Sequence, residues 1–358
     1  MCANLRGKKY HFKNEEYEKV EYERILKSYR LDTFSGVEKA QKEYDEFILK
    51  IPRKYVNAIQ NINCTGDVIS NSKNTRDSFV VKSFENSRYC DFCTRDKDVY
   101  DLTVSGELSE CYEGIVVDHS QLNRFGIFSP KNQDIHYTQH CHNCKYVIGC
   151  DALRNTNYSI LNKQYTKEEY EELLPKIIKH MNDMPYVDKK GNIYKYGEFF
   201  PSELSPFGYN ETQAPEQFPL TKEEALKEGY KWQDHTQHTT GKETLKPEDI
   251  PESINDVNES ILNEILSCIE CNRNYKIVQN ELIFYKKMEI PIPRRCFYCR
   301  HANRVKRRNP FKLWHRSCMC DKESHGHSGK CHEEFESTYS PDRSEIIYCE
   351  KCYQKEVY

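Results

Sequence analysis

The sequence contains no long apolar run. No segment approaches the ~18 consecutive apolar residues of a membrane-spanning helix. The first residues, MCANLRGKKYHFKNEEYEKV, also lack the apolar stretch of a signal peptide. We therefore expect a protein of the reducing cytoplasm. Thiols stay free in that compartment, so paired cysteines are more often metal ligands than disulfides.

Apolar residues are scarce overall. They make up 37% of the 358 residues, with two tryptophans and five methionines, against a usual apolar share of ~45–50%. One large core of the doubly wound enzyme type is therefore not expected. The 12% of aromatic residues still need places to pack, which argues against disorder. Several small units are expected, and small units usually need staples such as metal ions.

A short repeat in residues 61–165 predicts a β-solenoid. Small or polar residues suited to a corner recur every 11 or 12 residues, at Asn74, Asn86, Asp98, Ser109, Gln121, Asn132, Asn143 and Asn155. In a solenoid each unit supplies a strand that stacks ~4.8 Å from the next coil. Asparagine at the corner tolerates left-handed backbone.

The apolar residues of this repeat indicate which side chains should point inward. The sixth position of successive units is apolar in seven of nine cases, including Ile69, Val80, Phe92, Val104 and Ile115. If two units form one coil, the segment holds about four coils. The alternative is a meandering antiparallel domain in which the spacing is accidental.

The repeat changes the interpretation of its cysteines. Cys90-x-x-Cys93 and Cys141-x-x-Cys144 lie 51 residues apart, or ~10 Å along the solenoid axis. Four thiolates so placed cannot converge to ~2.3 Å from one metal. Most cysteines of the repeat are therefore predicted to be small core residues, namely Cys64, Cys90, Cys93, Cys111 and Cys150. A metal site remains open for the denser cluster of His140, Cys141, His142 and Cys144.

Helical segments flank the repeat. Residues 1–60 are charged and compatible with helices, and we expect them to cap the first coil, because an open solenoid end exposes strand edges. Thr166-Lys-Glu-Glu169 is a capping box that should begin a helix over the far end. Pro175 should kink or divide that helix. The remainder of 166–250, rich in proline, glycine and aromatics, is expected to lead to the C-terminal units.

The unit at 251–310 contains two cysteine pairs. They are Cys268-x2-Cys271 and Cys296-x2-Cys299, and the segment 272–295 separates them. Each pair can form a knuckle that binds one zinc ion through two thiolates, and two knuckles complete a closed tetrahedron. Such a site has no open position for water, so it stabilises a fold and does not catalyse.

In the second unit, 311–358, five thiols compete for four ligand positions. Cys349-x2-Cys352 forms a knuckle, with Cys331 as a partner. We expect Cys320 as the fourth ligand, with Cys318 as the alternative. His325 and His327 in the loop SHGHSG are further candidates. The sequence thus predicts two structural Zn²⁺ sites and no small-molecule cofactor. The alternative is unliganded buried thiols.

Residues 294–316 form a basic run. The whole chain has 53 Lys and Arg against 56 Asp and Glu, a net charge of -3, whereas this run has no acidic residue. Basic side chains and aromatic rings suit phosphates and unpaired bases. We therefore consider it a candidate for RNA or DNA contact, above all at Arg300, Arg304, Lys306, Arg307, Arg308 and Trp314. Alternatively, the acidic segment 247–270 neutralises the run within the chain.

Several segments carry a resemblance to a known family, namely YGEFFPSELSPFGYNET, PRRCFYCRHANRVKRRNPFKLWHRSCMC and FESTYSPDRSEIIYCEKCYQKEV. With them the chain resembles a family of zinc-ribbon proteins of environmental bacteria and giant viruses. Residues 268–299 are similar to the small zinc-ribbon domain of such proteins. The resemblance implies zinc modules, and a virion location if the chain is viral. It implies no activity, since none is established for that family.

Together these features predict a mainly β, multidomain protein, with a short-repeat β-solenoid, helical caps and C-terminal zinc-ribbon or treble-clef-like modules. The favoured function is non-enzymatic binding of a macromolecule, either nucleic acid or protein, without membrane contact. A structural or assembly role is the alternative, and an enzyme is less favoured. The groups available for catalysis on the solenoid are Asp91, Asp101, Asp118, His119, Asp134 and His136, but no phosphate loop, nucleophile elbow or HExxH motif accompanies them.

Overall fold

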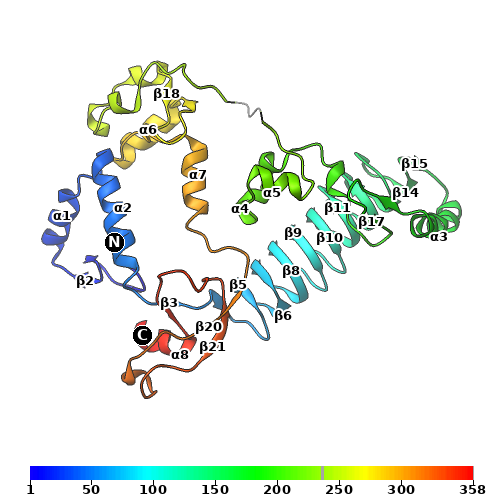
Figure 1. The fold of residues 1–358 in the computed structure, drawn as a ribbon, viewed down its shortest axis with the longest axis horizontal. Helices are drawn as coiled ribbons and strands as arrows, with labels where there is room; N and C mark the ends of the chain where they lie inside the picture. Colours follow the sequence, from blue (N-terminus) through cyan, green and yellow to red (C-terminus); the bar gives the residue numbers. More distant parts are fainter. Residues whose placement is uncertain (235–237, 358) are drawn as a thin grey trace.

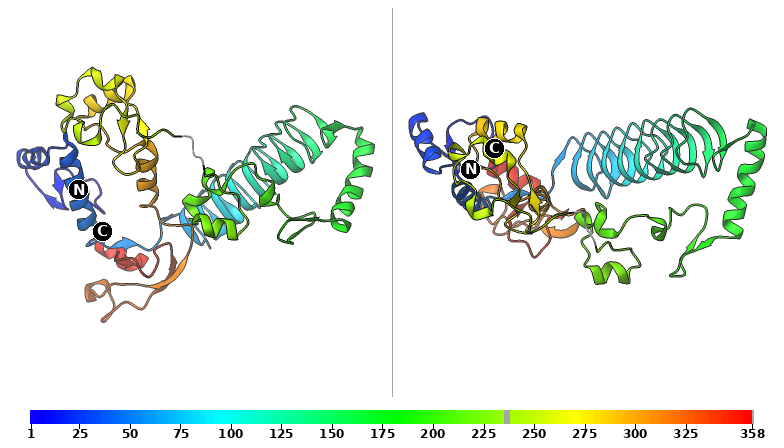
Figure 2. Two further views of the ribbon diagram at one scale, coloured as in Figure 1. Left: turned by 45° about the horizontal axis from the view of Figure 1, so that its top comes forward. Right: turned by 90° about the horizontal axis from the view of Figure 1, so that it is seen from above.

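The computed structural model describes residues 1–234 and 238–357. The predicted β-solenoid is present and forms one end of an elongated molecule (Figure 1). The cysteine-rich modules and both chain termini lie at the other end, as Figure 2 shows from two further sides. A straight stack of strands therefore projects from a cluster of small units.

The solenoid is built from a short coil with four corners. From Gly66 onward, each strand pairs in parallel with the strand of the next coil, as in Gly66↔Ser78 and Lys145↔Asn157. Every third residue from Asn71 to Leu161 has a positive φ, Gly149 included. The chain therefore turns a corner every three residues and closes one coil at every fourth corner, which gives about nine coils.

The strands stack in chain order, except that β6 pairs with β8. They are β4 (Ala58–Ile59), β5 (Gly66–Ser70), β6 (Lys73–Arg76), β7 (Ser78–Lys82), β8 (Glu85–Thr94), β9 (Tyr100–Gly106), β10 (Tyr112–Asp118), β11 (Gln121–Ile127), β12 (Gln133–Gln139), β13 (Lys145–Ile148), β14 (Asn157–Ile160) and β15 (Lys163–Gln164). The last strand, β15, turns back antiparallel to β14 and ends the stack.

The coil is half as long as the sequence suggested, because one unit and not two completes it. The first coil is one residue shorter than those that follow, as the pairing Ala58↔Ile69 shows. Asn74, Asn86 and Asp98 do share one corner, where Asn74 Nδ2 donates to Asn86 Oδ1 at 3.1 Å and Asn86 Nδ2 to Asp98 Oδ1 at 3.0 Å. Asn143 and Asn155 lie on the preceding corner of the coil.

In each coil, each of the four sides of the solenoid directs one side chain inward. Residues at every third position, such as Phe84, Val99, Leu102 and Ile135, point inward and are buried. The sixth-position residues were expected inward, and for most of them this was wrong. Val104, for example, lies on a corner with φ 60° and is 41% exposed.

Small polar side chains also fit this interior because their hydrogen bonds are satisfied there. Ser78 Oγ accepts from the N–H of Cys90, one coil later, at 3.2 Å and donates to the carbonyl of Arg76 at 2.8 Å. Cysteine donates in the same way, with Cys90 Sγ 3.3 Å from the carbonyl of Arg88. A core of this kind needs few large apolar residues, which accounts for the low apolar share of the chain.

The far end of the solenoid is covered by α3 (Lys167–Asp183), as expected. The capping box is formed, because Thr166 Oγ1 accepts from Glu169 N at 3.2 Å and the Glu169 carboxylate accepts from Thr166 N at 2.9 Å. The helix continues through Pro175 without dividing. Tyr170 packs edge-on against Tyr158 of the last coil, with ring centroids 5.9 Å apart. This contact seals the apolar end of the stack.

The segment after α3 returns along the side of the solenoid (Figure 2). It contains β16 (Tyr186–Val187), β17 (Ile193–Tyr194), α4 (Ala214–Gln217) and α5 (Lys222–Lys227). The hydroxyl of Tyr196 lies 2.6 Å from His136 Nδ1, and Phe200 packs edge-on against Tyr137. Tyr196 and Phe200 of this segment thus pack on the solenoid wall.

The near end of the solenoid differs from expectation. The helices α1 (Lys19–Ser28) and α2 (Phe34–Ile48), preceded by the hairpin of β1 (His11–Phe12) and β2 (Glu15–Glu16), lie away from the first coil (Figure 1). Phe34 N donates instead to Glu252 O at 3.0 Å, in the first cysteine module. The reason is that α2 carries acidic side chains that pair with the basic run, as shown below.

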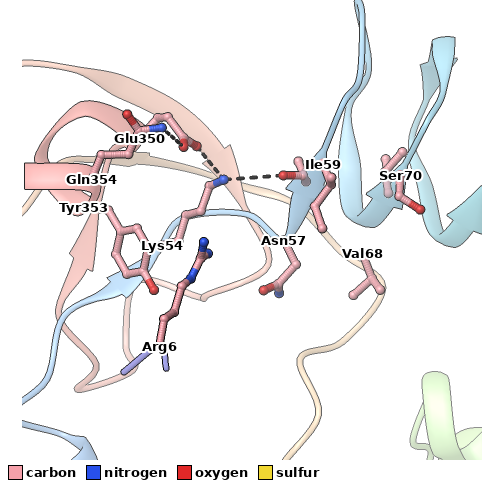
Figure 3. Close-up of a pocket in the computed structure, with 11 residues that line it drawn as sticks. Arg6, Lys54, Asn57, Ile59, Val68, Ser70, Glu350, Tyr353 and Gln354 are labelled. Carbon is pink, nitrogen blue, oxygen red and sulfur yellow. Dashed lines mark hydrogen bonds and ion pairs between the residues drawn. The ribbon is translucent and has the colours of Figure 1, made fainter. Parts of the chain in front are cut away.

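The second cysteine module contacts the first coils in place of those helices. Thr338 Oγ1 donates to the buried Asp67 carboxylate at 2.6 Å. The strand β3 (Arg53–Lys54) pairs in parallel with β22 (Ile347–Tyr348). Lys54 Nζ bridges Glu350 at 2.6 Å and the carbonyl of Ala58 at 3.4 Å, beside a cavity of about 630 Å³ (Figure 3).

Asp96 occupies one of the inward-pointing positions of the solenoid, so it allows the assignment of those positions to be tested. It is 1% exposed. Its Oδ1 accepts from Leu108 N at 2.8 Å, and its other oxygen accepts from the Ser105 hydroxyl. Burial raises the pKa of Asp96 to about 6. Three coils later Asn132 takes the same position, with Oδ1 accepting from Cys144 N at 2.7 Å and Nδ2 donating to Cys141 O at 2.9 Å.

We expect Asp96→Asn to stabilise the solenoid at pH 8 by about 1–3 kcal/mol. The folded pKa lies above the unfolded value of ~3.9, so the wild-type protein loses stability as pH rises from about 4 to about 6 and does not regain it above. Urea unfolding at pH 5 and pH 8, followed by circular dichroism, measures the difference. Asp98→Asn, at a half-buried corner of the same coil, is the control. An equal or unfavourable effect of Asp96→Asn at pH 8 would contradict the inward register.

Candidate metal centres

The first module brings its four predicted ligands together. Cys268 and Cys271 follow β18 (Leu266–Ser267), in the turn before β19 (Asn274–Tyr275), where Asn272 has φ 57°. Cys296 caps α7 (Phe297–Val305), which carries Cys299. The four sulfur atoms lie within 4.8 Å of one another.

The geometry of this cluster fits a tetrahedral metal ion. Cys271 Sγ and Cys296 Sγ are 3.7 Å apart, close to the edge of about 3.8 Å that follows from four bonds of ~2.3 Å in a tetrahedron. Burial opposes a charge on Cys268, but backbone N–H groups of Cys296, Glu270 and Cys271 lower its pKa to about 7. The site can therefore hold a metal ion through thiolates.

This module also has an apolar core of its own, next to the cysteines. The helix α6 (Gln279–Met288) contributes Leu282 and Tyr285 to it. The acidic segment 247–270 contributes Ile250, Ile254 and Ile261. That segment is therefore a structural part of the module and holds its acidic side chains near the basic run.

The second module forms a four-thiol cluster in which one ligand differs from expectation. Cys318, Cys331, Cys349 and Cys352 are all buried and lie within 4.8 Å of one another. Cys318, the alternative, thus takes the place expected for Cys320. Its sulfur accepts from Cys349 N at 3.2 Å, the N–H···S bond of a metal knuckle. The close spacing of these two cysteines in the sequence could not decide between them.

The backbone explains why Cys318 is chosen. It follows β20 (Trp314–Ser317), which pairs antiparallel with β21 (Glu334–Ser337), and Cys318 N donates to Glu333 O at 2.8 Å. Cys352 lies in α8 (Glu350–Val357). Cys320 points to a different group, made with His327 and Cys352.

The cysteines of the solenoid are core residues. Cys90, Cys93, Cys111, Cys141, Cys144 and Cys150 all occupy inward positions and are buried, while Cys64 is partly buried against the same core. Burial raises the pKa of Cys93 and of Cys111 to about 12. Within the described residues, none of these thiols belongs to a group of three or more metal-binding atoms.

The cluster around Cys141 does not converge on one point. Cys141 and Cys144 point into the solenoid, whereas His140 and His142 are exposed. His140 stacks on Phe128, with ring centroids 5.7 Å apart. Because the two thiols and the two imidazoles lie on opposite sides of the backbone, they cannot share one metal ion.

Most of the acidic and histidine groups considered for catalysis on the solenoid are engaged in local pairs. His119 lies 2.6 Å from Asp118 and 2.8 Å from Glu107. His136 lies 3.3 Å from Asp134, and Arg124 pairs with the same carboxylate at 3.0 Å. Asp91 and Asp101 lie at other positions of the coil than these pairs. The Asp91 carboxylate accepts a hydrogen bond from the Thr103 hydroxyl at 2.9 Å.

Part of the basic run is neutralised within the chain, beginning with its first two arginines. Arg294 pairs with Glu252 at 2.8 Å and donates to Ile250 O at 3.0 Å. Arg295 pairs with Glu270 at 2.5 Å and with Glu38 at 2.9 Å. The acidic segment 247–270 therefore does lie against the start of the run, and α2 adds a second acidic side chain.

The six residues considered for nucleic-acid contact differ in their exposure and in their ion pairs. Arg307 pairs with Asp45 at 2.9 Å, and Arg308 lies 4.0 Å from Glu216. Arg300 and Trp314 are half-buried. Arg304 and Lys306 are exposed, and no ion pair is found for either across the described part of the chain. The run thus keeps a small unpaired basic patch at the end of α7.

Comparison with known proteins does not add a family. No family model matches the chain, and no curated protein matches it significantly. The structure itself shows cysteine clusters that can hold metal ions beside a solenoid, which is consistent with zinc-ribbon-like modules. Over residues 1–234 and 238–357, no helix combines the length and apolar character needed to cross a membrane.

Removal of metal should therefore affect the modules and spare the distant coils. We expect a strong chelator, in the presence of a thiol reductant, to abolish amide-exchange protection around residues 266–275 and 314–318, because the thiolates repel one another without the ion. Residues 133–160 should keep their protection. Hydrogen-exchange mass spectrometry measures both regions in one sample. Unchanged protection in the modules, or loss in the distant coils, would contradict this assignment.

Proposed function

We propose that this chain is a non-catalytic, zinc-stabilised scaffold that binds another protein along its solenoid. Thiolate clusters of closed tetrahedral geometry are typical of structural zinc. The solenoid supplies a straight wall on which side chains repeat at each coil. One observation carries the proposal, namely that an exposed apolar pair on the wall occupies the same coil positions as the pair on which the chain docks one of its own segments.

The internal docking site binds Phe311. This ring stacks on Phe79, with centroids 4.9 Å apart and planes within 4°, and packs against Phe92 at 5.4 Å. Arg308 lies over the Phe92 ring at 5.8 Å. The segment that links the two cysteine modules is thus held on the first coils by an aromatic residue and an arginine.

This exposed apolar pair lies three coils further along the solenoid, at the coil positions of Phe79 and Phe92. In the strand pairing, Phe79 aligns with Asp91, Asp91 with Thr103, and Thr103 with Ile115. Phe92 occupies a corner of its coil, and Phe128 occupies the same corner three coils later. Ile115 is 38% exposed and Phe128 48% exposed. An apolar pair at the coil positions of Phe79 and Phe92 is therefore exposed, with His140 stacked on one side of the Phe128 ring.

The charges beside this pair indicate the kind of partner. Asp101 and Glu113 lie on the adjacent corner column, where they would repel phosphates and attract a basic side chain. The partner that fits is a polypeptide segment carrying an aromatic residue and a basic residue at the spacing of Arg308 and Phe311. Such a contact repeats, between molecules, the contact made within this chain.

A peptide of residues 305–313, VKRRNPFKL, tests this directly. We expect it to shift the methyl resonances of Ile115 and Ile127 in the full chain, with a dissociation constant of about 0.1–1 mM. Phe128→Ser should abolish the shifts, whereas Ile62→Ser, an exposed apolar residue elsewhere on the solenoid, should not. The same peptide with alanine in place of phenylalanine is the ligand control. Absence of shifts at Ile115, or equal shifts at Ile59 and Ile62, would refute the proposal.

RNA or DNA contact at α7 is a second candidate function. It is supported by the exposed Arg304 and Lys306 and by exposed rings of Phe297 and Tyr298 at the start of the same helix. Arg273 lies 4.7 Å from the centroid of the Tyr298 ring. Rings and unpaired cations so placed suit single-stranded nucleic acid.

Fluorescence anisotropy with labelled oligouridine at low salt measures this activity. If the patch contacts two phosphates, the double variant Arg304→Ser, Lys306→Ser should lower the slope of log K against log salt by about 1.4. Lys179→Ser, on α3 at the opposite end of the molecule, is the control. No binding at low salt, or an equal loss in the control, would exclude this candidate.

A further inference from the structure

The second module contains metal-binding groups in excess of one four-thiol site. Outside the quartet, Cys320 Sγ and His327 Nε2 lie within 4.8 Å of each other and of Cys352 Sγ, a sulfur that also belongs to the quartet. We propose that these groups bind a second zinc ion, joined to the first by the Cys352 thiolate. The inference rests on metal occupancy of the quartet, not on the protein or nucleic-acid partner proposed above.

The hydrogen bonding of His327 leaves a free lone pair on the nitrogen that faces the site. Its Nδ1 lies 2.8 Å from the carbonyl oxygen of Gly329. A carbonyl only accepts, so Nδ1 carries a proton, and in the neutral imidazole Nε2 is then the nitrogen with the free lone pair. Nε2 lies 3.4 Å from Cys352 Sγ. A ligating histidine usually donates its other N–H to such an oxygen.

A further imidazole, that of His325, contacts Cys320 but lies outside the group of three whose ligand atoms are within 4.8 Å of one another. It is 8% exposed, with Nδ1 3.1 Å from Cys320 Sγ and Nε2 3.5 Å from the Glu356 carboxylate. Lys322 holds that carboxylate from the other side at 2.6 Å. A carboxylate behind the far nitrogen orients an imidazole and makes it a stronger ligand. Two neighbouring histidines thus both direct a nitrogen toward the spare thiol or the shared one.

The local charge also favours a second ion. One divalent ion among four buried thiolates leaves two uncompensated negative charges, and the fully buried Cys320 would stand beside them as a fifth sulfur. A second divalent ion that takes Cys320, the neutral His327 imidazole and the shared Cys352 thiolate leaves only one. The ninth C-terminal cysteine then has a ligand role, and the loop that carries both histidines is fixed to α8.

Zinc content of the full chain tests the inference. After dialysis against a weak chelator with reductant, we expect three zinc ions per chain by elemental analysis. Cys271→Ser, which affects only the first module, should contain two. His327→Gln should also contain two, with both four-thiol sites filled. Two zinc ions in the wild type, or three in His327→Gln, would overturn the proposal of a second ion in this module. None or one in the wild type would mean that a four-thiol site stays empty, which would overturn both this proposal and the zinc-stabilised scaffold.

A second measurement does not depend on the variants at the site. X-ray absorption of the Cys271→Ser protein, in which all zinc lies in the second module, should show a zinc–zinc distance of about 3.5–4 Å and mixed sulfur and nitrogen ligation. Sulfur-only ligation without a zinc–zinc distance would mean a single ion, and would overturn the proposal even if His327→Gln failed to fold.

Discussion

The closure of one coil by four closely spaced corners is the constraint on which the solenoid depends. A left-handed residue at every third position turns the chain, so the residue that follows each corner faces the axis. The interior has room for one side chain per side, and serine, cysteine and valine fill it as well as leucine does. Backbone and small side-chain hydrogen bonds between coils therefore replace much of the apolar burial on which other folds depend.

A stack of this kind has two ends that it cannot cover itself. At the far end α3 lies over the last coil, with Tyr170 against Tyr158. At the near end the second cysteine module contacts the first coils through Phe311 and Thr338. The modules are small, and thiolate clusters supplement their short apolar cores. The result is a straight wall of stacked coils joined at one end to units whose cysteine clusters can hold metal ions.

The sequence predicted the solenoid and the clustering of cysteines, but it misplaced the phase of the repeat. Polar residues drift from one corner to the next, so the Asn74 column does not reach Asn143. The spacing C-x-x-C is ambiguous for a physical reason, since it matches both a metal knuckle, as at Cys268, and the inward period of this coil, as at Cys90. The choice of Cys318 over Cys320 and the position of α2 depend on contacts between distant segments, which local patterns do not encode.

The central claim is that metal-binding and core-forming cysteines are separated along the chain. Anomalous X-ray diffraction at the zinc edge, on crystals of the full chain, tests it most directly. The account predicts density between the cysteines of each C-terminal module and none along the solenoid axis. Density beside Cys90 and Cys93, or beside Cys141 and Cys144, would contradict it, as would empty C-terminal clusters in protein purified without chelator.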